Sequence, residues 1–277
     1  VGVYNVIKTV RQGSPVTDEE AEAAALPVIA SSRLRNEKVH AWLERKPVQF
    51  TILTVLAVSI GGLIQIVPML IVKSNIATIT SVKPYTPLEL EGRDLYIREG
   101  CNNCHSQLVR PFRSEVKRYG EYSKSGEYVY DHPHLWGSKR TGPDLMRVGG
   151  KYPHSWHFSH MWNPQATTTG SIMPAYKWMF DNKKMKHDDK QKKMSVMKTL
   201  GVPYTDADIA NAFTSIEKQA LEIEKGLETD PNFSKSYAAS KEKAKITGEK
   251  FVQMKDREIV ALIAYLQRLG TDIKVKK

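Results

Sequence analysis

The chain has 277 residues, of which 26% are charged, and its formal net charge is +11. A chain of this length suits one or two domains. With so much charge most of it must face water, which excludes a protein that lies mainly within a membrane.

The first residues predict an arm that precedes a membrane anchor. The opening "VGVYNVIKTVRQG" is apolar and then basic, which is typical of the last turns of a membrane helix. The acidic, alanine-rich segment 14–32 is bounded by prolines and predicts a linker. Residues 35–46 predict an amphipathic helix at the membrane surface, with Trp42 in the headgroup layer. Since the chain opens on Val1, we expect a processed N-terminus or the C-terminal part of a longer polypeptide.

Residues 48–72 form a stretch of 25 residues without a charge. A helix of that length spans roughly 38 Å, enough to cross a hydrocarbon core of about 30 Å. A signal peptide is excluded, because the stretch begins late, is too long and lacks a cleavage site after it. A buried helix would need a larger apolar surround than the chain offers. We expect one transmembrane helix, with Gln65 and Pro68 facing other helices rather than lipid.

The flanking charges predict how this helix is oriented. Basic residues crowd its N-terminal side, and Lys73 stands nearly alone beyond the other end. By the positive-inside rule, residues 1–47 are expected in the cytoplasm and the chain after about Ser74 in the periplasm of a bacterium. The basic residues on the N-terminal side are Arg33, Arg35, Lys38, Arg45 and Lys46.

After a tether at 73–84, residues 85–277 predict one domain. A first helix is expected over 86–105, with Thr86 and Glu89 as a capping box. Its fold class is mainly α, with loop-rich insertions.

Later segments of the domain differ in character. Residues 106–180 are rich in Gly, Pro, His and aromatics and predict loops. The Lys-rich insert at 181–200 predicts a solvated surface segment rather than a binding patch, and we expect no nucleic-acid partner. Helices are predicted over 205–228 and 255–270, the last with one apolar face and Gly270 at its end.

The two cysteines lie three residues apart and are followed by a histidine. Cys101, Cys104 and His105 form C-x-x-C-H, the attachment signature of c-type haem. Positions i, i+3 and i+4 share one helix face, so both thiols can reach one porphyrin. A zinc site would need a second ligand pair, and a thioredoxin-like pair would follow a strand. A disulfide between such close neighbours would be unusual, so one covalently attached haem c is the preferred interpretation.

A six-coordinate iron needs a second axial ligand besides His105. Met173, in "GSIMPAY", lies 68 residues further on, beside Pro174. A thioether there would raise the reduction potential relative to a second histidine. Met146, Met161 and Met179 are competitors for which core packing is the simpler explanation. A cluster of five histidines carries no matching acidic or thiol ligand, so structural roles are favoured over a metal site: His132, His134, His154, His157 and His160.

Four segments together resemble the class I cytochrome c layout. They are "GRDLYIREGCNNCH", "TGPDL", "SIMPAY" and "IVALIAYLQRLG". The resemblance implies that the first helix crosses the last, with Gly92 and Tyr96 near Ala264 and Tyr265. It also implies that the Pro143 carbonyl accepts a hydrogen bond from the haem histidine, and that Leu145 packs on the ring.

A longer string narrows the resemblance to one family. The sequence from "CNNCHSQLVRPF" to "TGPDLMRVGGKY" is similar to the mono-haem subunit of cbb3-type cytochrome c oxidases. This resemblance implies that Met173 is the distal ligand. It also implies an electron-transfer subunit without substrate chemistry of its own. Electrons would pass from a di-haem or other donor cytochrome c to the haem-copper catalytic subunit. The N-terminal piece resembles the end of that catalytic subunit, so we expect the chain to be fused to it or cut from such a fusion.

Two arginines near the haem motif have open roles. Arg110 and Arg113 are expected either to pair with the haem propionates or a partner's surface, or to form ordinary salt bridges. Rival functions are the cytochrome c subunit of a nitric oxide reductase and a haem c peroxidase or sensor with an open iron site. The peroxidase and sensor interpretations require that Met173 does not bind iron.

Overall fold

The computed structural model describes residues 2–13, 39–72, 77–181, 185 and 189–274. The predicted linker at 14–32 lies outside these residues, as do parts of the tether and of the Lys-rich insert. The chain divides into two compact units, Val1–Ile71 and Val72–Lys277.

The first unit consists of the helices α1 (Gly2–Gln12), α2 (Val39–Glu44) and α3 (Pro47–Ile71). In α3, the candidate membrane span Pro47–Met69 contains an 18-residue stretch with a mean hydropathy of 2.2, in which no residue is buried. Within the described residues, this helix alone is long and apolar enough to cross a membrane. The predicted membrane-spanning helix is therefore confirmed in length and composition.

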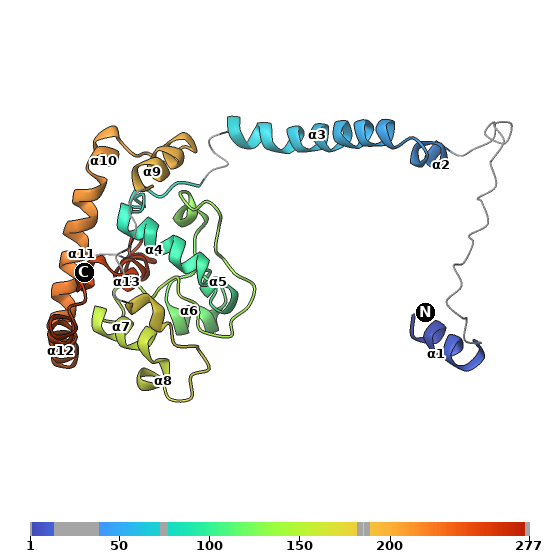
Figure 1. The fold of residues 1–277 in the computed structure, drawn as a ribbon. Coiled ribbons are helices and arrows are strands. Elements are labelled where there is room, and N and C mark those ends of the chain that lie inside the picture. The colour runs from blue at the N-terminus through green and yellow to red at the C-terminus, as the bar shows by residue number, and fades with distance from the viewer. Residues whose placement is uncertain (1, 14–38, 73–76, 182–184, 186–188, 275–277) are drawn as a thin grey trace. The chain divides into compact units, whose positions relative to one another are not determined.

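The second unit is built on the crossing of α4 (Pro87–Arg98) and α13 (Glu258–Arg268), at the centre of the domain in Figure 1. Gly92 makes this crossing possible, because a Cβ atom there would overlap the Ala261 carbonyl and the Tyr265 Cβ. The Tyr96 and Tyr265 rings meet edge to face, with centroids 5.4 Å apart. The expected crossing is present, with the closest backbone approach at Ala261 rather than Ala264.

The predicted helix over 86–105 is interrupted. A capping box starts α4, in which Glu89 N–H donates to Thr86 Oγ1 at 3.2 Å and Thr86 N–H donates to Glu89 at 2.8 Å. The helix ends at Arg98, and Gly100 takes a left-handed conformation, with φ of 68°. A separate turn, α5 (Cys101–Cys104), follows. Glycine adopts this conformation without steric cost, so the chain changes direction immediately before the cysteines.

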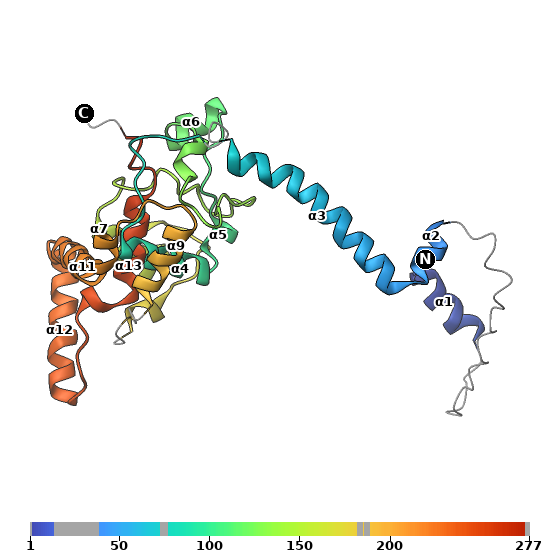
Figure 2. The same ribbon diagram turned by 90° about the horizontal axis from the view of Figure 1, so that it is seen from above.

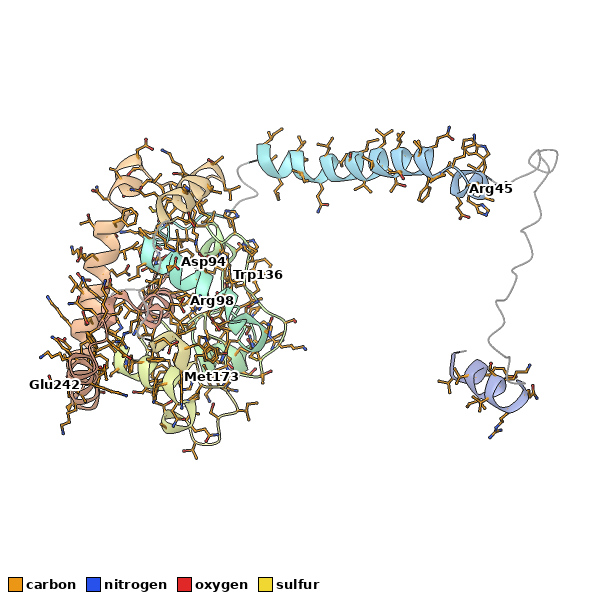
Figure 3. The ribbon with its side chains drawn as sticks, viewed as in Figure 1. Arg45, Asp94, Arg98, Trp136, Met173 and Glu242 are labelled. Carbon is orange, nitrogen blue, oxygen red and sulfur yellow. The ribbon has the colours of Figure 1, made fainter. Side chains whose placement is uncertain are left out.

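The Lys-rich insert is not wholly a solvated segment, which corrects that prediction for its described part. Helix α9 (Lys190–Thr199) packs against α4 and buries Met194. Lys190 pairs with Glu91, and Lys193 pairs with Asp94, which Figure 3 labels on α4. The insert therefore has both an apolar face and specific ion pairs, which its lysine content alone does not predict.

The remaining helices surround this centre. The predicted helix at 205–228 is divided at Asn211 into α10 and α11, and α12 extends away from the domain (Figure 2). No strand occurs in the described parts of the chain, so the mainly α fold class is confirmed. The other α-helices are α6 (Arg113–Tyr119), α7 (His154–Trp162), α8 (Pro164–Thr167), α10 (Asp206–Ala210), α11 (Ala212–Glu228) and α12 (Pro231–Thr247), and the 3-10 turns are Ser125–Tyr128, Lys177–Phe180 and Met254–Asp256.

Candidate functional site

A cavity of about 560 Å³ lies inside the second unit. Its wall is formed by α5, the segments 141–148 and 168–176, α7, and two leucines of α13, Leu262 and Leu266. Pockets for cofactors and small ligands are typically about 300–1,000 Å³. The cavity therefore has room for a cofactor, and it brings together segments that are far apart in the sequence.

His105 stands on one wall with its orientation fixed. Its Nδ1 lies 2.8 Å from the carbonyl oxygen of Pro143, so Nδ1–H donates and Nε2 keeps its lone pair. Burial lowers the pKa of the His105 ring, while the Pro143 carbonyl acts in the opposite direction. A Cβ atom on Gly142 would overlap the imidazole, so only glycine allows the chain to pass this close to His105.

A buried polar network joins the His105 segment to the segment that carries Pro143. Asp144 accepts hydrogen bonds from the Ser106 hydroxyl at 2.6 Å and from the Leu108 N–H at 2.8 Å. Arg140 donates to the Ser106 hydroxyl at 2.7 Å and to Glu115 at 2.8 Å. Sequence reasoning missed Arg140. Its position directly before "TGPDL" could have indicated a structural role, because a charged side chain beside a buried loop needs a partner.

Both cysteines line the cavity as free thiols. Cys101 is buried, and burial together with nearby Glu99 raises the pKa of its thiol to about 12. Cys104 is exposed. No group of three metal-ligating side chains lies within the described residues, and α5 follows a helix, so neither zinc nor a thioredoxin-like pair finds support there.

Two of the four candidate methionines line the cavity. Met173, labelled in Figure 3, is half-buried in the loop after α8, and Met161 is buried within α7. Met146 and Met179 are buried and do not line the cavity, as expected for residues that pack in the core. Met161 belongs to the main apolar core, whereas Met173 packs at its edge, so Met173 is the candidate with fewer competing contacts.

The two arginines singled out from the sequence do not line the cavity. Arg110 forms an ion pair with Glu115, with Nε 2.5 Å from Oε1, which is the salt-bridge alternative. Arg113 is exposed at the start of α6. Three cations that sequence reasoning missed do line the cavity: Arg118, Arg147 and Lys151.

The five histidines form two groups rather than one cluster. His134 stacks on Trp136 with ring centroids 4.5 Å apart, in the loop before the Pro143 segment. His154, His157 and His160 lie on α7, where His160 stacks on Trp156. Of these five histidines, His157 and His160 line the cavity. The sequence did not indicate which of the five would do so.

These residues fit a haem group. Two thiols, an imidazole with its second nitrogen held by a carbonyl, and a thioether meet around one cavity. Leu145, Leu262 and Leu266 add apolar wall for a porphyrin ring. Thiol, imidazole and thioether are the donors that proteins use for c-type haem.

The fold and the site together define a helical cytochrome domain on a chain whose described residues include one candidate membrane helix. A family model described as cytochrome c oxidase, mono-haem subunit/FixO, matches residues 40–273. The chain therefore belongs to this family of mono-haem cytochrome c oxidase subunits. No curated protein matches the chain.

Proposed function

We propose that this chain holds one haem c through Cys101 and Cys104, with His105 and Met173 as its axial ligands. It relays electrons from a donor cytochrome c, such as a di-haem subunit, to the haem-copper catalytic subunit of a cbb3-type oxidase. The observation that carries the proposal is the single cavity whose wall contains both thiols, His105 and Met173. Membership of the mono-haem oxidase subunit family supports it.

Haem, when bound, would supply a one-electron couple, and the chain's own residues would set its surroundings. Pro143 holds the proton of His105 on Nδ1, which leaves Nε2 free to bind a metal. Leu145, Leu262 and Leu266 would exclude water from the ring. A fixed ligand orientation and a dry site are the contributions of a protein that moves electrons without bond chemistry.

The membrane topology belongs to the same proposal. Helix α3 would anchor the chain once in the bacterial inner membrane, in contact with lipid and with the catalytic subunit. The basic residues before α3 favour a cytoplasmic N-terminus and a periplasmic haem domain. Because cytochromes c carry their haem on the outer face of the membrane, this orientation agrees with the proposed cofactor.

Optical spectroscopy of the purified full chain tests the ligand set. Spectra are recorded for oxidised and reduced protein, with and without carbon monoxide, for the wild type, Met173→Ala and Met161→Ala. We expect a low-spin c-type spectrum in the wild type that carbon monoxide does not change. Met173→Ala is expected to bind carbon monoxide while keeping its haem, and Met161→Ala is expected to resemble the wild type.

Other results would select another function. If the wild type itself binds carbon monoxide, the sixth position is open, and a peroxidase or a sensor becomes the better description. If only Met161→Ala opens the iron, the relay stands but its distal ligand is Met161. The third rival, a nitric oxide reductase subunit, has less support, because the matching family is that of an oxidase subunit.

A further inference from the structure

Asp144 places a buried negative charge beside the proposed iron ligand His105. The Asp144 side chain is 0% exposed. Along the chain Asp144 follows Pro143, whose carbonyl oxygen lies 2.8 Å from His105 Nδ1. Through space its carboxylate accepts a hydrogen bond at 2.6 Å from the hydroxyl of Ser106, the residue that follows His105. Two independent connections therefore hold the carboxylate close to His105.

The partners of Asp144 suit an ionised carboxylate. Two backbone N–H groups donate to it, from Leu108 at 2.8 Å and from Met146 at 2.9 Å. The Ser106 hydroxyl and Arg140 Nη2 are the other two donors, with the arginine nitrogen at 3.5 Å. An ionised carboxylate is the form that accepts hydrogen bonds on both oxygens and donates none. The domain is therefore built to hold a negative charge at this position.

Arg140 compensates this charge only in part. Its Nη2 lies 2.8 Å from Glu115 but 3.5 Å from Asp144, so Glu115 is the closer carboxylate. Its Nε donates to the Ser106 hydroxyl, at 2.7 Å, rather than to Asp144. A charge-assisted N–H···O bond of full strength is about 2.7–2.9 Å long. Asp144 therefore keeps a share of its negative charge that no cation cancels at close range.

A buried charge close to an iron ligand changes the reduction potential of the iron. Charges are weakly screened in a protein interior, so the carboxylate acts over several ångströms and need not touch the haem. Charge and hydrogen bonding around the ligands are among the means by which proteins set a haem potential. Ferric haem carries one more positive charge than ferrous haem. A nearby negative charge therefore lowers the reduction midpoint, and a nearby positive charge raises it.

We propose that Asp144 and Arg140 form a charge pair that sets the reduction potential of the haem, with Asp144 lowering the midpoint and Arg140 raising it. Both residues act through their charge rather than by contact with the haem. The inference rests on the proposed haem c and adds to its ligand set two residues that control its potential.

A purely structural role for the same two residues predicts a different pattern. Their bonds join the His105 segment to the Pro143 segment, so either substitution would then loosen the site and admit water to the haem. Water stabilises the more highly charged ferric form, and the midpoint would fall in both variants. A rise on removal of the negative charge therefore identifies the charge effect.

The test is a redox titration of the purified full chain in detergent with its haem attached. Asp144→Asn removes the negative charge at nearly constant size, and Arg140→Gln removes the positive charge but keeps an N–H donor. Arg110→Gln is the matched control, because Arg110 pairs with the same Glu115 through a side chain that is 54% exposed. Spectra recorded with and without carbon monoxide establish that each variant keeps its axial ligands.

We expect Asp144→Asn to raise the midpoint and Arg140→Gln to lower it. The double variant is expected to lie between the two single variants, because the two charges act in opposite directions. Arg110→Gln is expected to show at most a small part of the Arg140→Gln shift, because its charge is exposed to water and screened.

Three results would overturn the inference. A lower midpoint in both Asp144→Asn and Arg140→Gln means that the substitutions act by loosening the site. Unchanged midpoints with intact axial ligation mean that the network is structural only. A shift in Arg110→Gln as large as that in Arg140→Gln means that the midpoint follows the net charge of the domain.

Loss of haem from one variant still leaves a decision. If Asp144→Asn loses its haem, Glu115→Gln replaces it, because it removes the other negative charge that Arg140 compensates. If Arg140→Gln loses its haem, Asp144→Asn decides alone. In either case a raised midpoint supports the inference, and a lowered or unchanged midpoint overturns it. Absence of covalent haem from the wild type would instead contradict the proposed function itself.

Discussion

The two sides of the cavity are held by very different contacts. On the histidine side, formed by α5 and residues 105–110 and 140–148, several long-range hydrogen bonds join two segments. Gly142 N–H donates to Cys104 at 3.0 Å, and Leu145 N–H donates to Ser106 at 2.9 Å. Arg140 and Asp144 connect the same two segments through their side chains.

The methionine side, residues 168–176, is held mainly by contacts within itself. Met173 N–H donates to the Ser171 hydroxyl at 3.3 Å, and Ser171 N–H donates to Thr168 at 3.1 Å. A hydrogen bond to another element runs from Tyr176 N–H to the carbonyl of Met161 in α7, at 2.9 Å. The side chain of Ile172, next to Met173, is 80% exposed.

This difference indicates where the chain relies on its own contacts and where it relies on a ligand. The chain itself holds the imidazole of His105 in place, because hydrogen bonds join the segment around His105 to the segment around Pro143. In the proposed haem site, the thioether of Met173 would gain most of its position by binding iron. Substitutions that disturb the histidine side are therefore expected to cost more than similar ones on the methionine side.

A pair of glycine substitutions gives the largest expected contrast. Gly142→Ala places a methyl group into the His105 ring, so we expect most of the haem attachment to be lost. In Gly170→Ala the methyl group meets no neighbour, and only the φ of 76° is strained, at a cost of about 1–2 kcal/mol. Haem content per protein, from the absorbance of the purified chains, measures both. Equal losses in the two variants would contradict the comparison.

A substitution of Arg140 tests the side-chain contacts that hold the histidine side of the cavity. Arg140→Met leaves Glu115 and Asp144 without their shared partner, and we expect the free energy of unfolding to fall by about 2–3 kcal/mol. Arg110→Met is the matched control, because the Arg110 side chain is 54% exposed and pairs with the same Glu115. Its expected cost is under about 1 kcal/mol. Urea unfolding in detergent measures both variants, and a larger loss in the control would refute the assignment.

The smallest expected effect is a dependence on acid pH. Hydrogen bonding from Arg140, supported by the Arg110 N–H, lowers the pKa of Glu115 to about 2, although burial opposes this. An unfolded Glu has a pKa of about 4.3, so the unfolded chain binds the proton first as pH falls. The stabilisation is complete above about pH 4.3 and is lost between about pH 4 and pH 2. Stability curves of the wild type and Glu115→Gln should converge over that range; a constant gap would contradict the pKa.

Local patterns were sufficient for several parts of this protein. The uncharged stretch at 48–72 predicted a membrane-length helix, and the Thr86 capping box predicted where α4 begins. The C-x-x-C-H motif placed two thiols and an imidazole side by side, because their spacing within the chain brings them together. Each of these features depends on neighbours a few residues away, which the sequence shows directly.

Other features depended on contacts between distant segments. The Lys-rich insert was predicted to be a solvated segment because it contains seven lysines. In the structure, buried Met194 and two ion pairs attach α9 to α4. Arg110 and Arg113 were chosen for their closeness to the cysteines in the sequence, whereas Lys151 and Arg147 reach the cavity from a later loop. Closeness along the chain is a poor guide when a loop returns to the site.

By itself, the sequence determined the membrane-length helix, the C-x-x-C-H motif and the first and last helices of the domain, because helix periodicity, charge and residue spacing are local properties. The tertiary structure alone decided that Met161 and Met173 both line the cavity, and that Arg140 joins the two segments beside His105. The physical reason is that a partner's distance, and whether water can reach a polar atom, are known only once segments far apart in the chain have packed together.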